Sequence, residues 1–173
     1  MFALVVDNRV IAVNEIGFTN ALVGNSFEFA EVEIGQICLD GELKGFPLDV
    51  LKAEKLTALS AACESTILQS IFNSSALGVS RLYRCRIVDQ LNINGYVVGT
   101  NNHSIDTYVD DKASAVPELH TPEQCTQVRV DMTKHIEVVR NYFSDLKERV
   151  NAIVEDTPEN RKKLELIAWE LNS

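Results

Sequence analysis

The chain has 173 residues, enough for one domain or two small ones, and carries a formal net charge of −9. This acidic balance argues against nucleic acid as a partner, because a duplex binder needs clustered lysines and arginines that neutralise phosphates. No apolar run approaches the roughly 18 residues of a membrane span, and the first residues lack the basic start of a signal peptide, so no membrane partner is expected.

Residues 1–45 are predicted to form a small β unit. Two apolar runs flank Asp7-Asn8, and asparagine tolerates the left-handed conformation that a two-residue hairpin turn requires. A second hairpin signal is centred on Asp40-Gly41. A sheet of about three to five short strands would be weakly stable alone, so we expect it to pack on the rest of the chain or on another copy.

A helix is predicted after this unit, from Asp49 to about Phe72. Asp49 is a good N-cap, and Asn73 followed by two serines would end the helix. Apolar residues at helical spacing give it one buried face, formed by Leu56, Leu59, Cys63, Ile67 and Ile71.

Two strands are predicted next, over residues 82–88 and 104–109, because apolar and polar side chains alternate in both segments. Between them the local chemistry supports two different structures. Asn94-Gly95 lies between apolar pairs, which is a strong hairpin signal. Asp89 could equally be the N-cap of a short helix.

The longest predicted element is a helix from Thr121 to Ile153. Thr121 is a good N-cap, Pro122 suits the first helical position, and Gln124 occupies the position of a capping-box partner. The apolar residues that follow are spaced by threes and fours and form one stripe, made of Cys125, Val128, Met132, Ile136, Val139, Phe143, Leu146, Val150 and Ile153.

This stripe has two interpretations. It could be a coiled-coil seam that forms a homo-oligomer, or the core face of a helix that packs within the chain. Two consecutive spacings of four, at Val128, Met132 and Ile136, interrupt a strict heptad, so we favour packing against the helix over residues 49–72. At about 1.5 Å per residue the helix is longer than a small domain is wide, so we expect residues 143–153 to project.

A last helix is predicted from Pro158, after the N-cap Thr157, to about Asn172. Leu164, Ile167, Ala168 and Leu171 would form its core face. Leu166 and Trp169 lie on the opposite side, and a second apolar face on a terminal helix can meet a partner. The first strand is the other candidate, as an exposed edge. The predicted interaction residues are therefore Phe2, Leu4, Val6, Leu166 and Trp169.

The chain is predicted not to be an enzyme, and no catalytic, metal-binding or cofactor-binding residue is expected. Nucleotide-binding and hydrolase motifs are absent from the sequence. Cys125 and His135 would lie about 15 Å apart on one helix, too far to share a metal. The four cysteines show no CxxC spacing and are expected to be reduced core residues of a cytosolic protein, at Cys38, Cys63, Cys85 and Cys125.

Two polar positions have a structural and a functional interpretation. Asp89, Gln90 and Asn92 could line a ligand site or brace buried backbone groups, and we favour bracing. His120 precedes the cap of the long helix, so we expect it to bond locally and brace the turn there.

Several stretches occur in an order and at a spacing typical of one family, namely Ala61-Ala62-Cys63-Glu64, Phe72-Asn73-Ser74-Ser75-Ala76-Leu77-Gly78, Tyr83, Asp89-Gln90-Leu91-Asn92 and His120-Thr121 with Gln124. On these residues the sequence from about residue 50 onward resembles the uncharacterised C-terminal domain of many bacteriophage tail-fibre and tail-fibre-associated proteins. The opening residues are similar to the small β unit that begins many such proteins, with Phe2 in place of the usual tyrosine. The family's usual tryptophan in the strand before the long helix is missing, and Tyr108 is expected in its place.

The patterns together predict an α+β protein with a small β unit over residues 1–45 and an α-rich domain over residues 49–173, which contains a short antiparallel sheet and one long helix. The resemblance implies that residues 89–98 are a helix. It also implies a structural component of a phage tail, associated with the tail fibre or baseplate, which is made in the host cytoplasm and binds other tail proteins. The alternative is a tail-fibre assembly chaperone that is absent from the mature virion.

Overall fold

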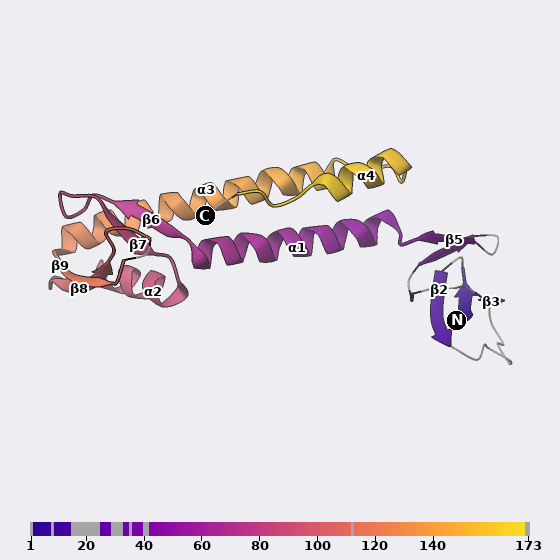
Figure 1. The fold of residues 1–173 in the computed structure, drawn as a ribbon, viewed down its shortest axis with the longest axis horizontal. Helices are drawn as coiled ribbons and strands as arrows, with labels where there is room; N and C mark the ends of the chain where they lie inside the picture. The colour runs from indigo at the N-terminus through magenta and orange to yellow at the C-terminus, as the bar shows by residue number, and fades with distance from the viewer. Residues whose placement is uncertain are drawn as a thin grey trace. The chain divides into compact units, whose positions relative to one another are not determined.

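The computed structural model describes residues 2–7, 9–14, 25–28, 33–34, 36–39, 42–111 and 113–171. The chain is an α+β protein, as predicted, and it divides into two compact units (Figure 1). Unit 1 contains residues 1–55 and 153–166, and unit 2 contains residues 56–152 and 167–173. This grouping places the start of the first helix and the whole of the last one with the N-terminal strands, whereas the boundary predicted from the sequence lies between residues 45 and 49.

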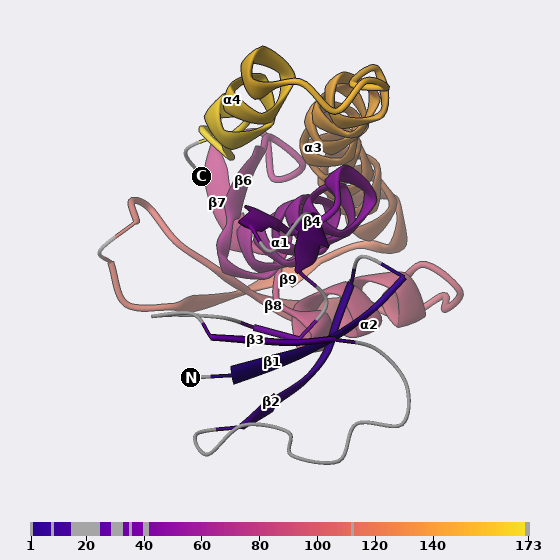
Figure 2. The same ribbon diagram turned by 90° about the vertical axis from the view of Figure 1, so that its right-hand side faces the viewer.

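Unit 1 contains an antiparallel five-stranded sheet in the order β3-β1-β2-β4-β5. Figure 2 shows β3, β1 and β2 of this sheet next to one another. Its strands are β1 (Phe2–Val6), β2 (Arg9–Asn14), β3 (Asn25–Glu28), β4 (Ile37–Leu39) and β5 (Glu42–Gly45). The predicted hairpin across Asp7-Asn8 is confirmed, because β1 pairs with β2 and Asp7 adopts a positive φ of 49°. The second hairpin is confirmed too, since β4 pairs with β5; Asp40 and Gly41 themselves lie outside the described residues.

The prediction that β1 is an edge strand is wrong. β1 pairs with β2 on one side and with β3 on the other, so its backbone hydrogen bonds are used within the sheet. Leu4 is half-buried and Val5 is buried, whereas the side chains of Phe2 and Val6 lie outside the described part of the chain. The first strand therefore offers no free edge to a partner.

The first helix, α1 (Leu48–Gln69), ends earlier than predicted. Ile71 and Phe72 continue its apolar spacing, but they belong to a strand, β6 (Ile71–Ser74), which pairs with β7 (Arg81–Arg84). The burial of β6 alternates, with Phe72 and Ser74 inside. Pairing with a strand from later in the chain thus overrides a local helical pattern at this position.

Residues 87–96 form a helix, α2 (Ile87–Tyr96), so the helical interpretation is confirmed and the hairpin interpretation is wrong. The predicted strand over residues 82–88 is correspondingly too long, since β7 ends at Arg84. The N-cap is Arg86 rather than Asp89. Asp89 occupies the third helical position, where its Oδ2 accepts a hydrogen bond from the backbone N–H of Arg86 at 3.2 Å.

A second hairpin of unit 2 joins β8 (His103–Thr107) to β9 (Val116–His120), and β9 was not predicted. Paired backbone hydrogen bonds of 2.9 Å between Leu82 and Tyr108 connect this hairpin to the one formed by β6 and β7. The expected alternation fails after Thr107, because Tyr108 is buried whereas Val109 is 65% exposed.

The longest helix, α3 (Pro122–Asn151), begins as predicted. The Thr121 hydroxyl accepts from the backbone N–H of Gln124 at 3.3 Å, and the Gln124 side chain accepts from the backbone N–H of Thr121 at 2.8 Å. Figure 1 shows β6 to β9 and α2 gathered around the first part of α3. The core there contains Phe72, Tyr83, Cys85, Ile93, Ile105, Cys125, Val128 and Met132.

The stripe on α3 is therefore a core face, and packing within the chain is confirmed. Ile67 of α1 packs against the same core. The expectation that residues 143–153 project is wrong, because Leu146, Val150 and Ile153 are all buried. No helix in the described ranges is both long enough and apolar enough to cross a membrane.

The last helix, α4 (Pro158–Leu166), is shorter than predicted. Its cap is as expected, since the Thr157 hydroxyl accepts from the backbone N–H of Asn160 at 3.2 Å. The helix ends at Leu166, before three residues of the predicted face, Ile167, Ala168 and Leu171. Leu164 and Ile167 are buried as expected, but Ala168 is exposed.

Replacing the cap of α3 should destabilise the protein. We expect Thr121→Ala to lower the free energy of unfolding by about 1 kcal/mol, because a backbone N–H in the first turn loses its acceptor. Urea denaturation would measure this change. The control is Thr133→Ala, an exposed threonine within α3 whose hydroxyl bonds only to the preceding turn. Equal destabilisation by both substitutions would contradict the capping role.

Candidate functional site

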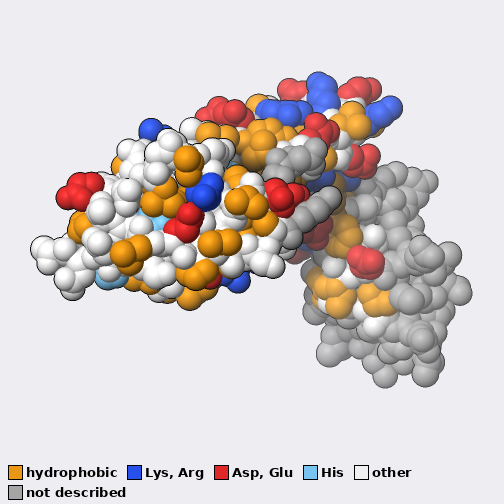
Figure 3. Space-filling model, turned by 60° about the vertical axis from the view of Figure 1, so that its left-hand side comes forward, with side chains coloured by type: hydrophobic (Ala, Val, Ile, Leu, Met, Phe, Trp, Pro, Cys, Tyr) orange, Lys and Arg blue, Asp and Glu red, His pale blue; other side chains and the backbone are white. Residues whose placement is uncertain are grey.

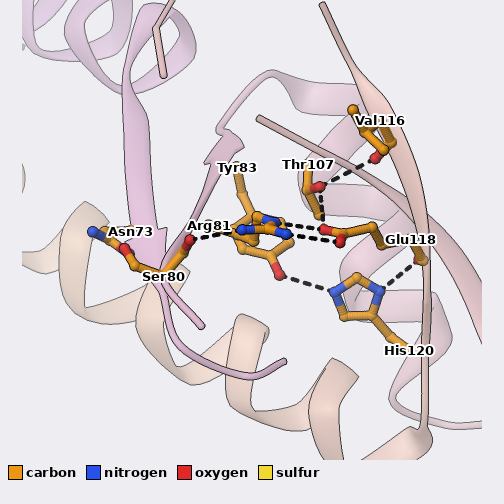
Figure 4. A network of polar contacts seen from close by, with 8 residues as sticks. All are labelled: Asn73, Ser80, Arg81, Tyr83, Thr107, Val116, Glu118 and His120. Atoms are coloured by element: carbon orange, nitrogen blue, oxygen red, sulfur yellow. Dashed lines mark hydrogen bonds and ion pairs between the residues drawn. The ribbon is translucent and has the colours of Figure 1, made fainter. Parts of the chain in front are cut away.

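Unit 2 contains a network of polar side chains between its two hairpins (Figure 4). Arg81 of β7 donates two hydrogen bonds to Glu118 of β9, from Nε to Oε2 at 2.9 Å and from Nη2 to Oε1 at 3.2 Å. The Thr107 hydroxyl lies against the same Oε2 and against the Val116 carbonyl oxygen, at 3.1 Å from the latter. Hydrogen bonds from Arg81, and then from Thr107, lower the pKa of Glu118 below its ordinary value of 4.5.

The buried centre of this network is a hydrogen bond between Tyr83 and His120. The Tyr83 hydroxyl lies 2.9 Å from Nε2 of His120, whose Nδ1 lies 2.8 Å from the carbonyl oxygen of Glu118. Because a carbonyl can only accept, Nδ1 carries the proton in the neutral ring, and Tyr83 donates to Nε2. Burial raises the pKa of Tyr83 well above its usual range, so the phenol keeps its proton.

This pair is buried and links two strands of unit 2. Tyr83 and His120 are 1% and 0% exposed, and Tyr83 also lines a small cavity between β7, α2 and β8. The bond joins β7 to the last residue of β9, immediately before α3 begins. His120 does brace the turn locally, through Glu118, as predicted; its second partner, Tyr83, is 37 residues away and was not predicted.

A second pair, Ser70 and His135, resembles a nucleophile with its general base, but the hydrogen bond between them runs in the opposite direction. Nε2 of His135 lies 2.7 Å from the Ser70 hydroxyl, which also donates to the Ile67 carbonyl oxygen at 2.9 Å. Since the hydroxyl has one proton and the carbonyl takes it, the imidazole must donate to the serine. A general base would accept from it instead. Burial lowers the pKa of His135, and its ring stacks on Phe72.

The predicted polar group at the start of α2 mainly braces the backbone. Asp89 binds Arg86 through both carboxylate oxygens, and Gln90 donates from Nε2 to the Cys85 carbonyl oxygen at 2.7 Å. These contacts provide the predicted bracing, while Asp89 also lines a small cavity and Gln90 also lines a groove between α1 and α3. Asn92 lines a cavity of about 130 Å³ between β7, α2 and β8.

That cavity is polar and too small for most ligands. Arg84 lies over the ring of Tyr108, with its guanidinium carbon 4.7 Å from the ring centroid. Its Nε is buried and has no hydrogen-bond partner among the described residues. The volume of about 130 Å³ is well below the roughly 300–1,000 Å³ of typical ligand pockets.

A larger hollow in unit 2 is a groove of about 620 Å³ between α1 and α3, which reaches the start of α2. On α1 its apolar lining consists of Cys63, Ile67 and Leu68. On α3 it is lined by Arg140, Phe143 and Lys147, and on α2 by Ile87. Phe143 was predicted as part of the stripe, but the two cations beside it were not singled out, because no local pattern shows which exposed residues of a helix face a groove.

An exposed apolar row on α2 adjoins this groove. Ile87, Val88 and Leu91 are 59%, 53% and 66% exposed, and residues at these spacings are neighbours on a helix surface. The opposite side of α2 is held in the core by Ile93. Figure 3 shows apolar side chains in several patches on the visible face of the described residues, with charged side chains scattered between them. A helix predicted from Ile87 rather than from Asp89 would have shown this second apolar side in the sequence, because Ile87 and Val88 fall in the segment that was predicted as a strand.

The predicted interaction residues near the C-terminus differ in exposure. Leu166 is 70% exposed at the end of α4. Trp169 lies after the helix and is half-buried against Tyr142, with ring centroids 5.1 Å apart and nearly perpendicular planes. Trp169 is thus partly covered within its own unit, whereas Leu166 remains available.

The four cysteines and the possible metal ligands are the remaining side chains with reactive chemistry. All four cysteines are buried and free, as predicted. Burial raises the pKa of the Cys85 thiol to about 11, so it stays protonated. Within the described ranges no group of three histidine, cysteine or acidic side chains is placed to hold a metal ion.

Among known protein families, one family model matches the chain, over residues 50–164, or about two thirds of its length. That family is described as a domain of unknown function (DUF4376). No curated protein and no solved structure matches the chain significantly.

Removing the phenol of Tyr83 should destabilise unit 2. We expect Tyr83→Phe to lower the free energy of unfolding by about 1–3 kcal/mol, because Nε2 of His120 is left buried without a donor. Chemical denaturation would measure the loss. The matched control is Tyr142→Phe, whose hydroxyl accepts only an exposed 3.3 Å bond from the backbone N–H of Glu170 and should change stability by less than about 0.5 kcal/mol. Indistinguishable effects would refute the role given to the pair.

The ion pair on Glu118 should make stability depend on pH. Its pKa is lowered in the folded protein, so its contribution is present above the unfolded value of 4.5 and is lost as the pH falls through the folded value. We expect Arg81→Gln to destabilise the protein near neutral pH, and its difference from wild type to narrow below pH 4.5. Urea denaturation midpoints at several pH values would test this. The control is Lys134→Gln, which changes an exposed lysine of α3. A difference that stays constant with pH would contradict it.

Proposed function

The chain belongs to the DUF4376 family, and we propose that this member is a structural component of a bacteriophage tail that acts by binding other tail proteins. The resemblance of residues 61–124 to tail-fibre-associated domains supports the setting. The observation that carries the binding role is the exposed apolar row on α2 beside the groove between α1 and α3.

The apolar row supports binding because it makes no evident contribution to the fold. An exposed side chain gains little from folding, and contiguous apolar patches on soluble proteins usually mark interaction sites. Ile87, Val88 and Leu91 together cover one side of a short helix, and Ile87 also lines the groove. Patch and groove thus form one continuous surface on unit 2.

The described polar pairs support a role without bond chemistry. Tyr83 and His120 are sealed in the core, and His135 donates to Ser70 instead of activating it. Arg81 and Glu118 are bound to each other. Each pair has a structural task, so the proposed mechanism is burial of apolar surface between proteins.

Location in the particle separates the proposal from the chaperone alternative. Mass spectrometry of purified virions of the phage that encodes the chain should find it in the tail. Its absence from virions, together with its presence on tail fibres in infected cells, would favour the chaperone. A cell-wall zymogram in which the purified chain clears the host glycan would overturn both and indicate an enzyme.

The apolar row should be needed for tail binding. We expect the double substitution Ile87→Ser and Leu91→Ser to reduce co-sedimentation of the purified chain with isolated tails at least about tenfold, because it removes apolar surface from the interface. The matched control is Val98→Ser with Val138→Ser, two exposed valines of unit 2 outside the row. Circular dichroism should show both variants folded. Equal binding by row and control variants would contradict the assignment.

A further inference from the structure

From the groove between α1 and α3 we infer a docking site for an amphipathic helix of a partner protein, with carboxylates along the edge that faces α3. This inference rests on the proposed binding function and adds the chemistry of the partner. The shape, the floor and the charges of the groove each point to this occupant.

The shape of the groove suits a helix. The residues of α3 that line it are three, four and seven positions apart, at Arg140, Phe143, Ser144 and Lys147, so they follow one helix face for two turns, or about 10 Å. The α1 wall runs over a similar length. An amphipathic helix places its apolar anchors at the same spacings, and such anchors fill grooves between helices.

The floor of the groove is apolar. Ile67 and Leu68 of α1 and Phe143 of α3 are half-buried there, so each still has surface that a partner can cover. Ile87 extends the apolar lining at the end where α2 lies and connects it to the row on α2. The apolar side of a partner helix would bury these side chains, which supplies the main driving force.

The charged residues on the rim of the groove, Arg140 and Lys147, favour a partner helix with acidic residues beside its apolar side. Arg140 and Lys147 are exposed on the α3 wall, and neither forms an ion pair with any residue in the described part of the chain. The α1 wall carries Glu64. Arg140 and Lys147, on either side of Phe143, outnumber Glu64 among the charged residues that line the groove, so its lining is net positive in a chain whose net charge is −9. They match an acidic edge at short range, where screening by salt is weakest.

Two synthetic helical peptides can test this docking site with the full-length chain. Both would carry leucines at positions i, i+3 and i+7; one would carry glutamates and the other lysines along the flanking edge. We expect the glutamate peptide to bind about tenfold more tightly in fluorescence anisotropy, since two rim pairs distinguish the peptides. The double reversal Arg140→Glu with Lys147→Glu should invert this preference.

A matched double reversal provides the control. Lys134→Glu with Lys162→Glu changes the net charge equally at two exposed lysines that do not line the groove. It should leave the preference for the glutamate peptide in place. If the control inverts the preference as strongly as the rim variant, net charge rather than the groove is responsible, and the inference fails.

Two further outcomes would overturn the inference. If neither peptide binds but the rim variant still sediments with tails, the groove is not the docking site, although the proposed function stands. If sedimentation equilibrium shows that the chain self-associates and the rim variant abolishes this, the occupant is a second copy instead. Loss of tail binding in the rim variant alone, with the peptide preference inverted, supports the inference.

Discussion

The hydrogen bond between Tyr83 and His120 is the constraint on which the rest of unit 2 depends. Both groups are removed from water, so each needs the other to avoid the cost of a buried, unsatisfied polar atom. Tyr83 also stacks on Phe72, with ring centroids 5.5 Å apart. The bond therefore joins β6, β7 and β9 around one point. Since His120 is followed directly by the Thr121 cap, it also sets where α3 starts.

The helical repeat carries the orientation of the first residues of α3 along the rest of the helix. At 3.6 residues per turn, a fixed first residue decides which side chains face the core and which lie at its margin. Cys125, Val128 and Met132 lie in the core cluster, whereas Phe143 is only half-buried at the edge of the stripe. This marginal position makes Phe143 part of the groove floor. The edge of the apolar stripe on α3 thus supplies one wall of the groove.

The sequence predicted those features whose signals are local. The box formed by Thr121 and Gln124, the hairpin at Asp7 and the apolar stripe each depend on residues within a few positions of one another. The errors occurred where distant partners decide. Ile71 fits the helical spacing of α1 but pairs with Arg84 in a sheet, and β9 has a weak apolar pattern because its role is to pair with β8 and to present Glu118 and His120. The groove was not predictable, because its walls meet only in the folded unit.

The helix α2 has polar side chains that fix its start and apolar side chains that remain exposed. A helix of ten residues is too short to be stable alone, so it must be held from outside. Arg86 with Asp89, the bond from Gln90 to Cys85, and the buried Ile93 supply that support. None of them involves the side chains of Ile87, Val88 or Leu91, which are more than half exposed. Apolar residues on a side that folding leaves more than half exposed lower solubility, which is the physical ground for our proposal that a partner covers this side.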